Sequence, residues 1–187
     1  MNLEETVATI RESFGDQILE STSFRDEETL VAAPGDLVIL LTYCFDLGFN
    51  CLLDITSVDN MGTEPRFEII YELYSFHDHI HLRIKARLPE DDPAVDTVSG
   101  IWPTADWHER EVYDMMGIDF RGHPDLRRIL MWEGYPYHPL RKEFPLAGKS
   151  SDVPEVAFTE PAPLDGGPFV TADGAKDVQR REPRSRE

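Results

Sequence analysis

The sequence predicts an α+β fold: a two-layer sandwich of a mostly antiparallel sheet with helices on one face, followed by an extended C-terminal segment. The segments 66–74 and 80–88 alternate apolar and polar residues, as strands with one buried face do. The N-terminus repeats apolar residues at helical spacing, whereas residues 118–146 show no sustained period. A sheet with one buried face needs helices packed against that face.

The N-terminal part is expected to form a helix and then a hairpin. Gly15 ends the helix, and the charged turn 25–28 separates two short segments, 18–24 and 29–33, that are typical of strands. The residues that define the helical spacing are Leu3, Val7, Ile10 and Phe14.

A second helix and three strands follow. Asp36 is the expected cap of a helix over 37–47, which stops at Gly48. The strands are expected at 51–59, 66–74 and 80–88. The alternating residues expected on the buried face of the last two are Phe67, Ile69, Tyr71, Leu73, Leu82, Ile84, Ala86 and Leu88.

A third helix is expected to begin near Trp102, with Thr104 or Asp106 as its cap, and to end near Gly117. The order α-β-β-α-β-β-β-α then makes a globular domain over 1–117. Residues 118–146 form an extended segment that is longer than an ordinary loop, and such loops are usually functional. Residues 147–187 are rich in Pro and Gly and are expected to form an irregular tail.

Composition limits the classes of partner. The net charge of −18 repels nucleic acid phosphates and anionic lipid headgroups, so neither is expected to bind directly. The longest apolar run, Leu37–Leu41, is far shorter than the roughly 20 residues of a membrane span, and we expect a cytoplasmic protein without one. Cys44 and Cys51 are the only cysteines, too few for an ordinary iron–sulfur cluster, and both are expected to be buried thiols.

Three blocks between Trp107 and Leu146 are dense in Arg, His, Pro and Gly. They are EREVYDM at 109–115, GHPDLRR at 122–128 and HPLRKEFP at 138–145. Guanidinium groups need carboxylate or carbonyl partners, and a loop this rich in them is typical of a surface bound by another protein. We therefore predict a docking surface made by Glu109, Arg110, Tyr113, Asp114, Gly122, His123, Pro124, Arg127, Arg128, His138, Pro139, Arg141 and Lys142.

An intrachain role for the same residues stays open. Arg110 and Asp114 are four residues apart on the expected helix, so they can also form an ordinary surface ion pair. His123 can be hydrogen-bonded inside its own loop, with the arginines paired to local carboxylates.

Other chemistries have weaker support. The run His77, His79 and His81 has a spacing that can bind a metal on a strand, but it falls where two strands must turn, so an exposed turn is the favoured interpretation. A nucleophilic triad around His123 lacks a partner, since no Ser, Cys or Thr occurs between Asp106 and Lys149. No glycine-rich nucleotide motif follows a strand, so no site for NADH, flavin or ATP is expected. Together, these observations predict no catalytic, cofactor-binding or metal-binding residue in this chain.

The three blocks resemble the signature of the C-subunit family of NADH–quinone oxidoreductase, the 30 kDa subunit family of respiratory complex I. Residues 52–59, LLDITSVD, and 67–74 also resemble strands of that family. The resemblance implies a non-catalytic peripheral-arm subunit of a proton-translocating complex. Such a protein braces the chains that carry electrons from NADH through FMN and iron–sulfur clusters to quinone.

The resemblance further implies that this chain binds no cofactor, because FMN, clusters and quinone belong to other members of the complex. The implied partners are the hydrogenase-like large D subunit and the cluster-bearing B and I subunits, at the cytoplasmic face of the inner (plasma) membrane. The family often has Glu-Gly directly before His-Pro, whereas here residues 135–137 intervene. The alternatives are the equivalent subunit of a related membrane-bound hydrogenase or other-donor dehydrogenase and, more distantly, an independent His-based enzyme.

Overall fold

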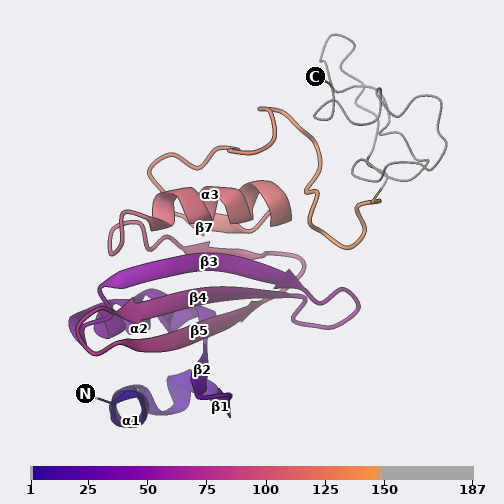
Figure 1. Ribbon diagram of the computed structural model, residues 1–187. Coiled ribbons are helices and arrows are strands. Elements are labelled where there is room, and N and C mark those ends of the chain that lie inside the picture. The colour runs from indigo at the N-terminus through magenta and orange to yellow at the C-terminus, as the bar shows by residue number, and fades with distance from the viewer. Residues whose placement is uncertain (1, 147, 149–187) are drawn as a thin grey trace, which may run out of the picture. The chain divides into compact units, whose positions relative to one another are not determined.

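The computed structural model describes residues 2–146 and 148 (Figure 1). The chain divides into two compact units, Met1–Arg141 and Lys142–Glu187, and every helix and strand of the described residues lies in the first. The segment expected to be extended therefore belongs, up to Arg141, to the same unit as the sheet. The irregular tail expected over 147–187 lies, except for Gly148, outside the described residues.

The element order agrees with the sequence prediction apart from two short strands. The helices are α1 (Leu3–Phe14), α2 (Leu37–Asp46) and α3 (Ala105–Met116), and short 3-10 turns cover Gly15–Gln17 and Pro34–Asp36. The strands are β1 (Ile18–Phe24), β2 (Glu27–Ala32), β3 (Cys51–Asp59), β4 (Phe67–Ser75), β5 (Ile80–Leu88), β6 (Ala94–Asp96) and β7 (Asp119–Arg121).

The main sheet has five strands in the order β1-β2-β5-β4-β3. All of its neighbouring pairs are antiparallel except β2 and β5, which run parallel. The parallel pair arises because the chain passes through α2, β3 and β4 before β5 returns beside β2. The expected α+β fold with a mostly antiparallel sheet is confirmed.

One face of the sheet is the core. The alternating residues of β4 and β5, from Phe67 to Leu88, are buried as predicted, and helix residues such as Ile10 and Leu41 pack in the same cluster. The other face carries ion pairs, for example Arg83 with Glu72. Period-two alternation therefore separates a dry face from a wet one, as an antiparallel sheet covered on one side requires.

Helix ends are fixed in ways that the sequence shows only in part. At the start of α1, the backbone N–H of Glu5 donates to Oδ1 of Asn2 at 2.7 Å, and the backbone N–H of Asn2 donates to Oε2 of Glu5 at 3.1 Å. These two bonds satisfy two amide groups at the helix start. Asp36 and Thr104 occupy the positions before α2 and α3, but neither side chain makes the expected capping bond. The prediction of these two caps was wrong, and the alternative cap, Asp106, lies inside the first turn of α3.

The two unpredicted strands, β6 and β7, pair in parallel and bring the start of the segment after α3 back to the sheet domain. Phe120 is buried there and continues the core. The sequence shows no sustained period over residues 118–146 and did not reveal β7, because a strand of three residues is too short for alternation to be recognised. The prediction of two buried thiols also holds only for Cys44, since Cys51 is partly exposed.

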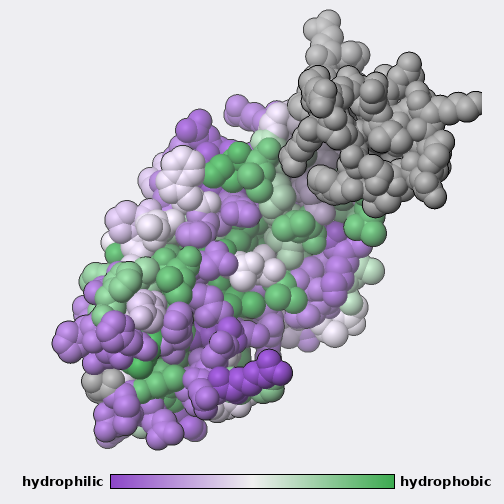
Figure 2. Space-filling model, viewed as in Figure 1, coloured by the Kyte–Doolittle hydropathy of each residue, from purple (hydrophilic) through white to green (hydrophobic). Residues whose placement is uncertain are grey.

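Hydrophilic residues cover much of the visible surface, and hydrophobic patches lie between them on several parts of it (Figure 2). Within residues 2–146 and 148, no helix has the length and apolarity that a bilayer crossing requires.

Candidate interface around helix α3

Helix α3 organises the segment that follows it. Asp114 is fully buried, and its Oδ2 accepts backbone N–H bonds from Ile129, Leu130 and Met131 at 3.1, 2.8 and 2.8 Å. Its Oδ1 forms an ion pair with Arg128. One carboxylate therefore closes a turn that lies fifteen to seventeen residues further along the chain.

Arginines complete this closure with carbonyl partners. Arg110 donates from Nε to the carbonyl of Arg127 at 3.1 Å and from Nη2 to that of Arg128 at 3.3 Å. The guanidinium of Arg110 also lies 5.1 Å from the ring centre of Trp107. The first two blocks of the sequence are thus bound to each other within one chain.

The third block binds the C-terminal end of α3. Arg141 donates from Nε to the carbonyl of Met116 at 2.6 Å, and Nδ1 of His138 lies 3.0 Å from the carbonyl of Asp114. Cations and donors stabilise the exposed carbonyls of a helix end. Gly117 ends the helix with φ +70°, and the two side chains approach it so closely that a Cβ there would lie 2.6 Å from each.

His123 connects the second block to the N-terminal half of α3. Its Nδ1 accepts the backbone N–H of Asp125 at 3.0 Å, while Nε2 lies 3.2 Å from the carbonyl of Asp106. Nε2 also lies 3.7 Å from Oε2 of Glu109. The side chains of His123 and Glu109 are both fully buried.

The buried carboxylates of α3 have opposite pKa shifts. Burial raises the pKa of Glu109, and hydrogen bonds from Thr97 and the backbone of Val98 offset this only in part. Burial alone would also raise the pKa of Asp114, but the Met131 N–H, Arg128 and two further backbone N–H groups outweigh it and lower that pKa. Burial likewise lowers the pKa of His138.

The predicted docking residues divide by exposure. The helix members Glu109, Arg110 and Asp114 are buried, and the described residues contain no Arg110–Asp114 ion pair. The intrachain alternative thus describes their contacts, while a role in binding another protein of the complex stays a prediction. Counted over backbone and side chain together, the half-buried members are Tyr113, His123, Arg128, His138, Pro139 and Arg141, although the side chain of His123 itself is fully buried. The exposed members are Gly122, Pro124, Arg127 and Lys142, of which Lys142 belongs to the second unit.

The segment exposes apolar side chains that sequence reasoning did not select. Trp107, Leu130 and Leu140 have 61%, 62% and 62% of their surface exposed. A Trp side chain in an amphipathic helix usually packs in the core, and nothing in the sequence shows that the side chain of Trp107 faces outward. Large exposed apolar side chains supply contact area at binding surfaces.

Among the residues that depart from the family pattern, the two tyrosines pack in an aromatic cluster with Trp132. Tyr135 is buried, with ring centres of Trp132 and Tyr137 at 4.5 and 5.6 Å. The guanidinium of Arg128 lies 5.7 Å from the Tyr135 ring. The residues at 135–137 therefore add packed aromatic side chains to the segment.

His77 and His79 lie in the turn between β4 and β5, as the favoured interpretation had it, whereas His81 lies on β5. His79 adopts φ +56° and its Nδ1 lies 3.1 Å from the Tyr74 hydroxyl, while His77 is 90% exposed. Among residues 2–146 and 148, no three metal-binding side chains converge on one point.

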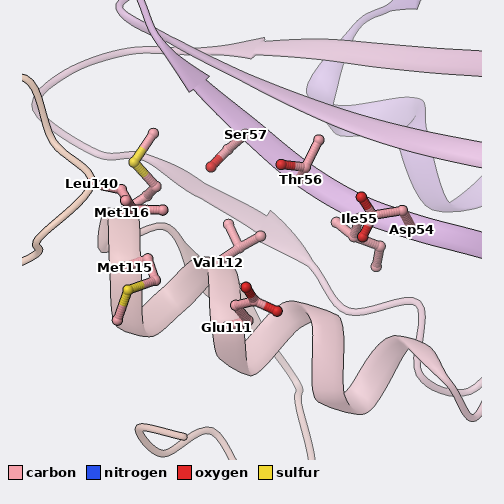
Figure 3. Close-up of a pocket in the computed structure, with 9 residues that line it drawn as sticks. All are labelled: Asp54, Ile55, Thr56, Ser57, Glu111, Val112, Met115, Met116 and Leu140. Atoms are coloured by element: carbon pink, nitrogen blue, oxygen red, sulfur yellow. The ribbon is translucent and has the colours of Figure 1, made fainter. Parts of the chain in front are cut away.

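A pocket of about 90 Å³ lies between α3 and β3 (Figure 3). Its α3 side presents Val112, Met115 and Met116, and its β3 side presents polar groups. Its lining residues are Asp54, Ile55, Thr56, Ser57, Glu111, Val112, Met115, Met116 and Leu140.

Residues 30–150 match the family described as "Respiratory-chain NADH dehydrogenase, 30 Kd subunit". The chain belongs to this family. The C subunit of the NADH-quinone oxidoreductase of Geotalea uraniireducens is 47% identical over 143 residues, which are 76% of this chain and 87% of that protein. The corresponding protein of Rhizobium etli, its C 2 subunit, is 43% identical over 159 residues, which are 83% and 84% of the two chains.

Two solved structures have a similar fold. A structure described as Nqo5, trypsin-resistant fragment 1–134, has a TM-score of 0.60 and 31% identity, covering 67% of this chain and all of that one. A chain of the membrane-bound sulfane sulfur reductase, an archaeal respiratory membrane complex, has a TM-score of 0.68 and 26% identity, covering 76% and 85%. The family predicted from the three sequence blocks is confirmed.

Proposed function

We propose that this 30 kDa family member is a non-catalytic peripheral-arm subunit of a proton-translocating NADH–quinone oxidoreductase. It braces the hydrogenase-like large D subunit and the cluster-bearing B and I subunits, at the cytoplasmic face of the membrane. FMN, iron–sulfur clusters and quinone are bound by those partners, and this chain binds none of them.

The observation that carries the proposal is that the family's three sequence blocks bind one another within the chain and leave large apolar side chains exposed. Their buried charges hold the segment after α3 in one shape, while Leu130 and Leu140 stay exposed on that segment and Trp107 stays exposed on α3 itself. A surface whose backbone is already ordered loses little entropy on binding, and exposed aromatic and aliphatic groups supply the contact area. That combination suits a permanent contact with a sister subunit.

An acid/base role for His123 is disfavoured by the same geometry. Its side chain is fully buried, and its Nδ1 is already occupied by the Asp125 N–H. A substrate atom would have to come within hydrogen-bond reach of a ring nitrogen for such a role.

The test uses membranes from cells that carry a tagged copy of the chain. After gentle solubilisation, we expect the tag to recover the D, B and I subunits together with NADH–quinone activity, and the isolated chain to have no activity. Two results together would contradict the proposal. The tagged chain would be recovered without the other subunits, and a deletion strain that lacks the chain would still assemble an active complex.

The likeness to a chain of the sulfane sulfur reductase favours a second candidate: the equivalent subunit of a complex with another electron donor or with hydrogenase activity. The same preparation discriminates the two. Quinone reduction supported by NADH selects the first, whereas recovery of the sister subunits without any NADH-driven reaction selects the second.

A further inference from the structure

We propose that the pocket between α3 and β3 receives an arginine side chain from a sister subunit. The inference rests on the proposed function, because it names what one part of this chain would bind within the complex.

The two walls of the pocket differ in chemistry. Val112, Met115 and Met116, from α3, are at most 7% exposed and form an apolar wall (Figure 3). Methionine side chains are flexible and polarizable, so they adapt to a guest of irregular shape. An alkyl stem can lie along this wall, as the stems of long cationic side chains do on apolar surfaces.

Hydrogen-bonding groups from both β3 and α3 complete the lining of the pocket. Thr56 and Ser57 of β3 present hydroxyl groups, and Glu111 of α3 presents an exposed carboxylate (Figure 3). Among the described residues, none of these three side chains has a hydrogen-bond or ion-pair partner. Asp54 adds a second carboxylate, which lies 3.2 Å from Nδ1 of His108.

The charge of the lining selects a cation. Two of the nine lining residues are acidic and none is basic, in a chain whose net charge is −18. Like charges at an interface are costly, so a partner surface here must bring positive charge. Several acceptors on separate side chains suit a guanidinium, which has five donors in a fixed plane, better than the point charge of an ammonium.

The size fits an end group and part of its stem. The volume of about 90 Å³ exceeds that of a single water, whose share of the liquid is about 30 Å³, and is too small for a free metabolite or cofactor. Leu140, 62% exposed, stands at the same pocket and would pack beside the entering chain.

The experiment places a diazirine-bearing amino acid at Thr56 in the tagged chain and illuminates the intact, purified complex. Thr56 is exposed, so the substitution leaves the core untouched. We expect one dominant adduct, on a sister subunit, within about four residues of an arginine. An adduct at a lysine without a nearby arginine, or no adduct to any other protein in a complex that contains this chain, overturns the proposal.

A second measurement tests the charge. Glu111→Gln is compared with Glu12→Gln, a matched change on the exposed surface of α1. We expect the first variant to leave the purified complex about tenfold faster than the second under a salt challenge, as loss of one charge-assisted hydrogen bond predicts. Equal release of the two variants overturns the proposal.

Exchange of the charges completes the test. Replacing the arginine found by the adduct with Glu should weaken retention, and Glu111→Arg in the same complex should restore it. The proposed function fails separately, because it requires only that the wild-type chain be recovered with its sister subunits.

Discussion

The backbone N–H of Asp125 donates to Nδ1 of His123 at 3.0 Å, across the Pro124 turn. An acceptor nitrogen carries no proton, so the neutral ring must hold its proton on Nε2, which faces the Asp106 carbonyl at 3.2 Å. We therefore expect ¹⁵N NMR of histidine-labelled protein at neutral pH to show a bare Nδ1 and a protonated Nε2 for His123. A proton on Nδ1 would contradict the contact.

Removing the Asp114 carboxylate should unfold the segment after α3. Asp114→Ala leaves three backbone N–H groups and Arg128 without their acceptor. Breaking a buried ion pair of this kind costs about 3–5 kcal/mol, which urea unfolding can measure. Asp119→Ala, which changes an exposed carboxylate, should stay within about 0.5 kcal/mol of the wild type.

The pH dependence of that effect follows from the lowered pKa of Asp114. A carboxyl whose folded pKa lies below its unfolded value contributes stability above the unfolded pKa, about 4, and loses it as the pH falls through the folded pKa. The advantage of wild type over Asp114→Asn should be constant near neutral pH and shrink below about pH 4. An advantage that persists unchanged in acid would count against ionised Asp114.

Glu109 should show the opposite dependence. Its folded pKa is raised, chiefly by burial, so its contribution is greatest below the unfolded pKa and declines as the pH rises through the folded pKa. Gln resembles the protonated form. We expect Glu109→Gln to gain stability relative to wild type between about pH 4 and neutral pH. Parallel stability curves for the two proteins would contradict this prediction.

Gly117 should not tolerate a side chain. Gly117→Ala places a Cβ 2.6 Å from Nη2 of Arg141 and Nε2 of His138, at φ +70°. The backbone strain and the clash together should cost about 2–4 kcal/mol in thermal or urea unfolding. Gly134→Ala is the matched control, because φ is +86° but no atom lies within 4 Å of the added carbon. Its cost should be only about 1–2 kcal/mol.

Trp107 should affect assembly more than folding. It is 61% exposed and stacks only beside Arg110, so Trp107→Ala should change the free energy of unfolding by no more than about 1 kcal/mol. Buried at an interface, a Trp of this kind is worth about 2 kcal/mol or more, and less of the variant should be recovered with the complex. Phe24→Ala, exposed beside Arg25, is the control, and equal losses for both variants would refute a special role for Trp107.

The helices and long strands could be predicted because burial on one side imposes a period on the sequence. Strand β5, for example, alternates from Ile80 to Leu88, and both of its predicted ends are correct. β7 could not be found this way, since three residues give no period and its partner β6 lies before α3 in the chain. The parallel pairing of β2 with β5 also depends on contacts between distant segments.

The contacts within residues 107–146 could not be predicted from the sequence, and the role of this region as an interface stays a prediction. The sequence marked residues 107–146 by their arginines, yet it could not show that Asp114 would bind backbone N–H groups, because every residue except proline supplies that donor. For the same reason Arg110 was expected to face outward, whereas it binds two carbonyls of its own chain. Whether Trp107 is buried depends on which face of α3 meets β3, and helical spacing alone does not decide that.

The turn at residues 129–131 depends on the carboxylate of Asp114, which is part of α3. This dependence sets an order in which the two parts of the chain can fold. Residues 129–131 acquire their acceptor only after α3 has formed, so Leu130 cannot be displayed in its final position by a nascent or partly unfolded copy. If this turn is part of the proposed interface, a copy in which α3 is unfolded presents a different surface to the sister subunits.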